Sequence, residues 1–191
     1  QVDYDNRGVL DVESGSLDIV GALRGDGEVR IGSGARLAVV RAESDVGAPG
    51  ARITGLGEFL LDSTIGALRA ELDLDGSLHV DRGSVELAGP IRQLGALRVS
   101  NQGSVRIAQP DQELARVALE SDGQLIADAP LRIRDRLDVA GGTISGSAPV
   151  ALAGETVASW SLGIDGGRLE NAGTLTIEAG GLSLVHGGHF I

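Results

Sequence analysis

The sequence contains no cysteine, no methionine and no lysine, and only four of its 191 residues are aromatic. Without cysteine the chain has no disulfide framework, no thiol nucleophile and no thiolate metal ligand. No apolar run reaches the length of about 18 residues that a membrane-spanning helix requires. The basic residues are 16 arginines against 27 acidic residues, a formal net charge of −11. This balance excludes the concentrated basic surface of a nucleic-acid-binding protein.

A short pattern of aliphatic, polar or small, and again aliphatic residues recurs along the chain. Clear examples are Leu17-Asp18-Ile19, Val29-Arg30-Ile31, Leu72-Asp73-Leu74 and Val85-Glu86-Leu87. Alternation of this kind places the outer two side chains on one face of a strand and the middle one on the other. The pattern therefore predicts short, half-buried strands.

The spacing of these motifs predicts how the strands are arranged. Their centres recur after 19 or 20 residues in eight pairs: Asp11 and Arg30, Asp18 and Ala38, His79 and Arg98, Glu86 and Arg106, Arg98 and Ala118, Ala118 and Asp138, Arg132 and Ala151, and Gly163 and Ser183. This period predicts an all-β, single-stranded parallel β-helix with about 20 residues and three short strands per coil. The alternative fold is a β-sandwich of antiparallel strands, which has no reason to repeat at this interval.

Residues between the predicted strands suit tight corners and regular stacking. Glycine is abundant, with 30 residues, and it adopts the backbone angles that corners need. Asn101 and Asn171 each stand two residues before a glycine and suit the same corners. Stacking also predicts two opposite-charge neighbours in adjacent coils, Asp11 with Arg30 and Glu86 with Arg106. Each such pair contributes roughly 0.2–1 kcal/mol.

Two segments interrupt the pattern within residues 1–191, which we expect to form one solenoid segment. Residues 41–52 hold no strand motif and contain glycine, proline and aspartate, so we expect a loop excursion there. Residues 109–116 look helical after Pro110, with Asp111 as the N-cap. Because the strand pattern shows no polar stop at either end, we expect the segment to derive from a longer stack.

Several runs resemble coils of bacterial β-helical surface proteins, namely autotransporter passenger domains and filamentous-haemagglutinin-like adhesins. They are NQGSVRIA (101–108), RGSVELAG (82–89) and RLENAGTLTIEAGGLSLVHGG (168–188). The resemblance implies export through the Gram-negative envelope and display at the cell surface or outside the cell. It also implies a rigid rod that attaches to host or neighbouring cells or associates with itself. Because no set of residues in the sequence has the roles of a catalytic site, we expect no enzymatic activity and no cofactor.

Three sets of residues are candidate sites. Arg24-Gly25-Asp26 is an integrin-type tripeptide at a glycine-rich corner and is a candidate cell-attachment site, although a three-residue motif of common residues also arises by chance. His186 and His189 place two imidazoles at one corner, but a metal site needs a third ligand, so we expect no metal there. His79 is the centre of a strand motif, and we expect it to face solvent.

Two further functions remain open. The first is a carbohydrate-active β-helix in which a groove beside residues 41–52 binds a glycan; Asp73, Asp75 and Asp81 lie close in sequence as candidate acids. The stacked column of His79, Arg98, Ala118 and Asp138 repeats no carboxylate, which disfavours a catalytic site on that column. The second is a subunit of a phage fibre or an extracellular filament that assembles through its ends.

Overall fold

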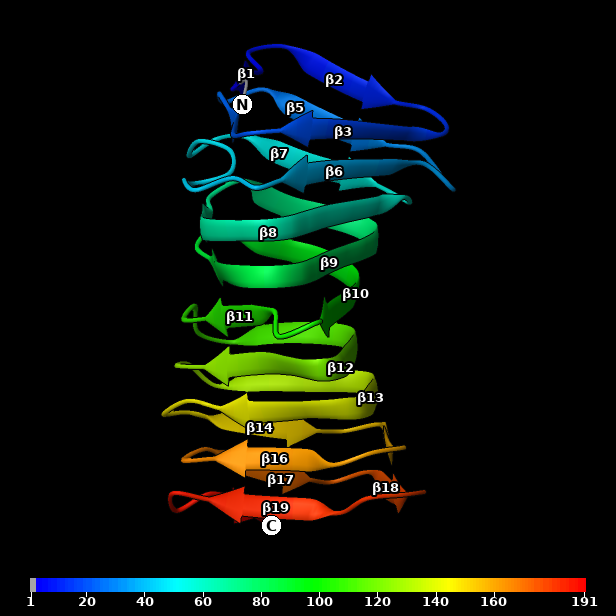
Figure 1. Cartoon of the computed structure of the whole chain (residues 1–191), viewed down its shortest axis with the longest axis vertical. Coiled ribbons are helices and arrows are strands. Elements are labelled where there is room, and N and C mark those ends of the chain that lie inside the picture. The colour runs from blue at the N-terminus through cyan, green and yellow to red at the C-terminus, as the bar shows by residue number, and fades with distance from the viewer. Residues whose placement is uncertain (1–2) are drawn as a thin grey trace.

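The chain forms a single elongated stack of β coils. A computed structural model describes residues 3–191 as a β-solenoid of about ten turns, with the N-terminal coil at one end and the C-terminal coil at the other (Figure 1). No helix is present among these residues, and therefore none is long and apolar enough to cross a membrane. The predicted fold class is confirmed.

Twenty strands make up the stack. Their bounds are β1 (Tyr4–Asp5), β2 (Val9–Val12), β3 (Ser16–Val20), β4 (Leu23–Arg24), β5 (Glu28–Ile31), β6 (Arg36–Val40), β7 (Arg52–Gly55), β8 (Glu58–Leu68), β9 (Glu71–Leu87), β10 (Ile91–Ser100), β11 (Ser104–Ile107), β12 (Gln112–Ala127), β13 (Leu131–Ser145), β14 (Pro149–Leu152), β15 (Glu155–Ala158), β16 (Leu162–Asp165), β17 (Arg168–Asn171), β18 (Thr174–Ile177), β19 (Leu182–Val185) and β20 (His189–Phe190). The longest of them, β9, bends around corners and pairs with both β7 and β8.

The strands form three parallel sheets, which we call faces A, B and C in the order in which each coil passes through them. Face A includes β2, β5, β7, β14 and β17, face B includes β3, β6 and β15, and face C includes β16 and β19. Every strand pair in the described residues is parallel, so the sandwich alternative is wrong. All eight predicted pairs of motif centres lie opposite each other in adjacent coils.

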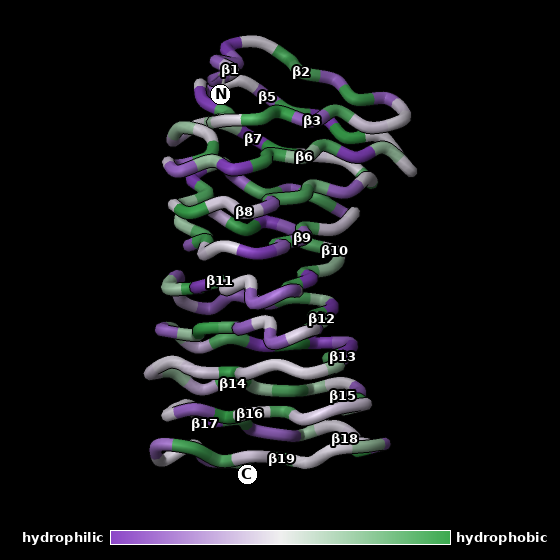
Figure 2. The backbone as a smooth tube through the Cα atoms, in the orientation of Figure 1, coloured by the Kyte–Doolittle hydropathy of each residue, from purple (hydrophilic) through white to green (hydrophobic). Residues whose placement is uncertain are grey.

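The interior is a set of stacked aliphatic columns. On face B the inward column runs through Leu37, Phe59, Leu78 and Leu97, each buried and each paired in register with the next. Figure 2 shows hydrophobic and hydrophilic stretches alternating along the coils from end to end. Full burial of one such side chain stabilises the fold by about 1.5–3 kcal/mol, so the stack is held mainly by these columns.

The corner between faces B and C repeatedly uses left-handed backbone. Positive φ angles recur there in successive coils, at 57° for Arg41, 53° for Ser63, 57° for Arg82, 52° for Asn101 and 49° for Ser121. Asn101 therefore behaves as predicted. The left-handed backbone predicted for Asn171 is wrong, because this last residue of strand β17 has no positive φ.

The two irregular segments are built into the wall. Within 41–51 only Val46 forms a β-bridge, with Leu68, and its buried side chain belongs to the core; Arg52 already begins strand β7. The next residue, Gly47, donates its N–H to the carbonyl of Leu23 at 2.8 Å, so the segment bonds to the coils on both sides. The helix predicted for 109–116 is wrong. Strand β12 begins at Gln112, and Leu114 points inward and pairs with Ile133, because the core column needs an aliphatic residue there.

Candidate binding groove

A groove of about 660 Å³ runs along the corner between faces A and B, and we call it the axial groove. It is lined by residues from six successive coils, between Gly34 near one end and Asp135 near the other. A second hollow of about 580 Å³ lies beside it on face B and shares Arg36 and Glu58 with it. A volume of this size is typical of ligand-binding clefts.

Glycine backbone forms the floor of the axial groove. A Cβ atom at Gly76 would lie 1.9 Å from the carbonyl oxygen of Gly57, and one at Gly95 would lie 2.0 Å from the carbonyl oxygen of Asp75. Side chains are excluded at these positions because consecutive coils approach each other closely there. The glycines therefore both close the corner and leave the groove open above it.

The walls of the groove carry two arginines without an ion-pair partner. Among residues 3–191 every other arginine is engaged: Arg41 has a partner, and each of the rest forms an ion pair with a carboxylate. The two exceptions, Arg36 and Arg116, both line the axial groove. In an acidic chain of net charge −11, unpaired cations gathered in one hollow are the unusual feature of the surface.

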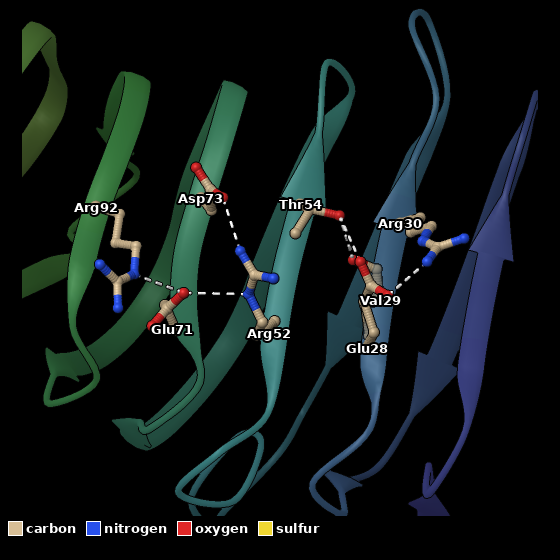
Figure 3. Close-up of polar contacts among 8 residues, drawn as sticks. All are labelled: Glu28, Val29, Arg30, Arg52, Thr54, Glu71, Asp73 and Arg92. Atoms are coloured by element: carbon tan, nitrogen blue, oxygen red, sulfur yellow. Dashed lines mark hydrogen bonds and ion pairs between the residues drawn. The ribbon is translucent and has the colours of Figure 1, made fainter.

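Face A shows the opposite arrangement. There Glu28, Arg52 and Glu71 stack in register with alternating charge, and Arg52 contacts both Glu71 (3.1 Å) and Asp73 (2.9 Å) (Figure 3). A hydrogen bond from Arg92 is the main reason that the pKa of Glu71 lies below its ordinary value of 4.5. Face A thus neutralises its own charges along the rod.

The two predicted pairs of opposite-charge neighbours are confirmed in register, but each arginine makes its closest ion pair with another carboxylate. Asp11 lies opposite Arg30, but the Arg30 guanidinium contacts Glu28 on its own strand at 2.7 Å. Likewise Glu86 lies opposite Arg106, whose guanidinium instead contacts Asp128. An arginine side chain is long enough to reach several carboxylates, so backbone stacking alone does not select its partner.

A polar network centred on His79 crosses face B beside the groove. The His79 side chain is only 14% exposed, which is far less than the sequence predicts. Its Nδ1 lies 3.3 Å from the Glu58 carboxylate and its Nε2 lies 2.8 Å from Ser100 Oγ. Ser100 Oγ in turn donates to Asp81 Oδ1 at 2.8 Å. Burial raises the pKa of Asp81, but hydrogen bonds from Ser100 and Asn101 outweigh it and hold that pKa below 3.8.

Glu58, His79 and Ser100 contact one another in the same order as the members of a serine–histidine–glutamate catalytic triad. The hydroxyl proton of the serine, however, points to a different partner. The single hydroxyl proton of Ser100 faces Asp81, so at Nε2 the oxygen accepts and His79 donates. The other ring nitrogen, Nδ1, faces the Glu58 carboxylate. A serine bonded in this way is not activated by the histidine. The network joins neighbouring coils, and Ser100 itself is 4% exposed.

The predicted attachment tripeptide lies in the wall near the N-terminal end. Arg24 is paired with Asp3 (3.0 Å), and a Cβ atom at Gly25 would lie 2.0 Å from the carbonyl oxygen of Asn6. The carbonyl of Gly25 accepts a hydrogen bond from the N–H of Ala48 at 2.9 Å. Asp26 is exposed. Cell attachment through Arg24-Gly25-Asp26 stays a prediction, now for a corner held between two coils.

The other sequence candidates are dispersed. His186 contacts Asp165 at 2.7 Å, whereas His189 lies in β20, and no group of metal-ligating residues occurs among residues 3–191. Asp73 pairs with Arg52 on face A, Asp75 lines the axial groove and Asp81 belongs to the His79 network. The axial groove itself was missed, since only stacked register brings its residues together.

Comparison with family models, with curated proteins and with solved structures finds no match.

Proposed function

We propose that the chain is a non-catalytic rod segment of an exported bacterial surface protein and acts in attachment or self-association. The observation that carries this proposal is the uninterrupted parallel stack of about ten coils around one aliphatic core. With about 4.8 Å per coil, such a stack is roughly 48 Å long, and each coil is bonded to its neighbours. A stiff rod of this kind holds a binding surface away from the cell that carries it.

The resemblance of residues 82–89, 101–108 and 168–188 to autotransporter and haemagglutinin-like coils supports the same function. It also supports an extracellular or cell-surface location. The partner under this proposal is a host-cell or neighbouring-cell surface, or a second copy of the chain. Paired surface charges, as on face A, suit a segment that stays soluble while exposed on all sides.

Attachment is tested with beads that carry the purified chain. We expect epithelial cells or Gram-negative bacteria to adhere to these beads more than to beads that carry an unrelated β-solenoid of similar length. Equal adhesion to both kinds of bead contradicts the proposal. An Asp26→Glu variant, with Asp18→Glu as the matched control, separates integrin-dependent attachment from attachment by other surfaces.

Glycan recognition is a second candidate function, and the axial groove is the observation that favours it. The groove lies at the corner between faces A and B, whereas residues 41–52 border a different hollow of about 380 Å³ through Glu43 and Ser44. A glycan-binding role would therefore use a surface other than the one that the sequence indicated.

A further inference from the structure

The two unpaired arginines stand in one straight column along the rod. On face B the outward positions Arg36, Glu58, Ser77, Ala96 and Arg116 pair in register, each with the next. Four strand spacings of about 4.8 Å separate the two arginines, which is roughly 19 Å. The residues between them are short, apart from Glu58, so the column forms a trough with a guanidinium at each end.

The carboxylates in this trough are already engaged. Glu58 lies beside His79, Asp75 accepts a hydrogen bond from Gln93, and Asp135 is held by Arg134. The hydrogen bond from Arg134 is also the main reason that the pKa of Asp135 lies below 3.8, with a smaller contribution from Arg116. Arg36 and Arg116 are thus the two arginines of the groove that form no ion pair with a carboxylate, and their guanidinium groups can donate hydrogen bonds to a ligand.

We propose that the axial groove binds an extended acidic saccharide whose carboxylate groups pair with Arg36 and Arg116. A planar guanidinium binds a carboxylate through two parallel hydrogen bonds, which gives each end of the groove a defined partner. Sugar hydroxyls both donate and accept, so the engaged carboxylates of Glu58 and Asp75 still serve the part of the chain between the two ends. This inference deepens the attachment function proposed above, on which its biological meaning rests.

The groove fits a saccharide better than an acidic peptide. An extended peptide brings a row of N–H and C=O groups that need partners, and these are normally found at the open edge of a sheet. In the middle of the stack the backbone groups of face B bond to adjacent coils, as between β8 and β9. A saccharide needs only side-chain partners, which the groove supplies.

The proposal is tested by measuring the binding of oligouronates of increasing length to the purified chain. We expect affinity to rise by about tenfold or more once an oligomer is long enough to reach both arginines, because the second contact becomes intramolecular. The single variants Arg36→Ala and Arg116→Ala should bind short oligomers and lose this dependence on length. The double variant should lose most of the binding, while Arg106→Ala, which removes an arginine from face C, should bind like the wild type.

Other outcomes overturn the inference. Unchanged binding by the double variant, or equal binding of neutral dextran, shows that the arginines do not recognise the ligand. Tighter binding of poly-glutamate than of polyuronate replaces the saccharide by an acidic peptide. Circular dichroism and thermal unfolding confirm that each variant is folded. If the wild-type chain binds no oligouronate but cells still adhere to it, the inference about the groove is wrong and the attachment function stands. If it binds oligouronate but cells do not adhere, the attachment function is wrong and the inference about the groove stands.

Discussion

Face A and the axial groove are built by the same coils and use charge in opposite ways. On face A, Arg52 and Arg92 share the carboxylate of Glu71, and each guanidinium is satisfied within the rod. One corner away, Arg36 and Arg116 have no such partner. Both arrangements surround the same aliphatic core. Coil geometry is therefore set by the core and the corners, and the outward columns can differ without disturbing it.

The largest expected effect on stability comes from a substitution in the floor of the axial groove. In Gly76→Ala the new methyl would lie 1.9 Å from one backbone oxygen and 2.6 Å from the carbonyl carbon of Leu56. Backbone on this side cannot move without opening the corner, so we expect a loss of about 2–4 kcal/mol in the free energy of unfolding. Urea unfolding measures it. Gly8→Ala is the control, because no atom lies within 4 Å of the added Cβ. Equal midpoints for the two variants would contradict this account of the floor.

A substitution in the His79 network should have the second-largest effect on the free energy of unfolding. Ser100→Ala removes a buried hydroxyl that both His79 and Asp81 contact, and we expect a loss of about 1–3 kcal/mol because those groups stay behind without it. The matched control is Ser77→Ala on the same face, where no side-chain hydrogen bond is lost. Unfolding in urea is again the measurement. If Ser100 reacted with a fluorophosphonate probe, the non-catalytic assignment of this network would be wrong.

The outward arginines give the smallest effect and the sharpest contrast between the two regions. Arg52 is 47% exposed and contacts two carboxylates, so Arg52→Ala should cost no more than about 0.2–1 kcal/mol. Arg36→Ala should leave the free energy of unfolding unchanged, because its side chain has no partner to lose. High salt should erase the difference by screening the exposed pair. A cost for Arg36→Ala equal to that for Arg52→Ala would show that Arg36 has a structural partner.

The fold was predictable because the hydrophobic pattern that produces it is short and recurs in every coil. A hydrophobic alternation with a period near 20 residues places Asp18 opposite Ala38 and Arg98 opposite Ala118, as the structure shows. The helix at 109–116 failed because local preferences at Pro110 and Asp111 compete with a core that needs Leu114 in a strand. Asp111 adopts a φ of 56° at the corner instead of capping a helix.

The candidate site was less predictable, for two physical reasons. The irregular segment 41–52 lengthens one coil, so Arg36 and its neighbour Glu58 are 22 residues apart. A repeat of 19 or 20 residues therefore does not predict that they are neighbours. Stacking also fixes which Cα atoms are neighbours, whereas the reach of a long side chain decides which carboxylate it meets. Arg106 therefore pairs with Asp128 although Glu86 lies opposite it. That Arg36 and Arg116 lack partners becomes visible only when all side chains are placed.

The in-register column that joins Arg36 to Arg116 has a consequence for how such a molecule can change. Each coil bonds only to the coil before it and the coil after it, so duplication or deletion of one whole repeat leaves the remaining contacts intact. The gap between the two guanidinium groups would then lengthen or shorten in steps of about 4.8 Å. The number of coils between the two arginines therefore sets the length of ligand that the groove prefers. Gain or loss of a repeat, in evolution or by engineering, would change that length.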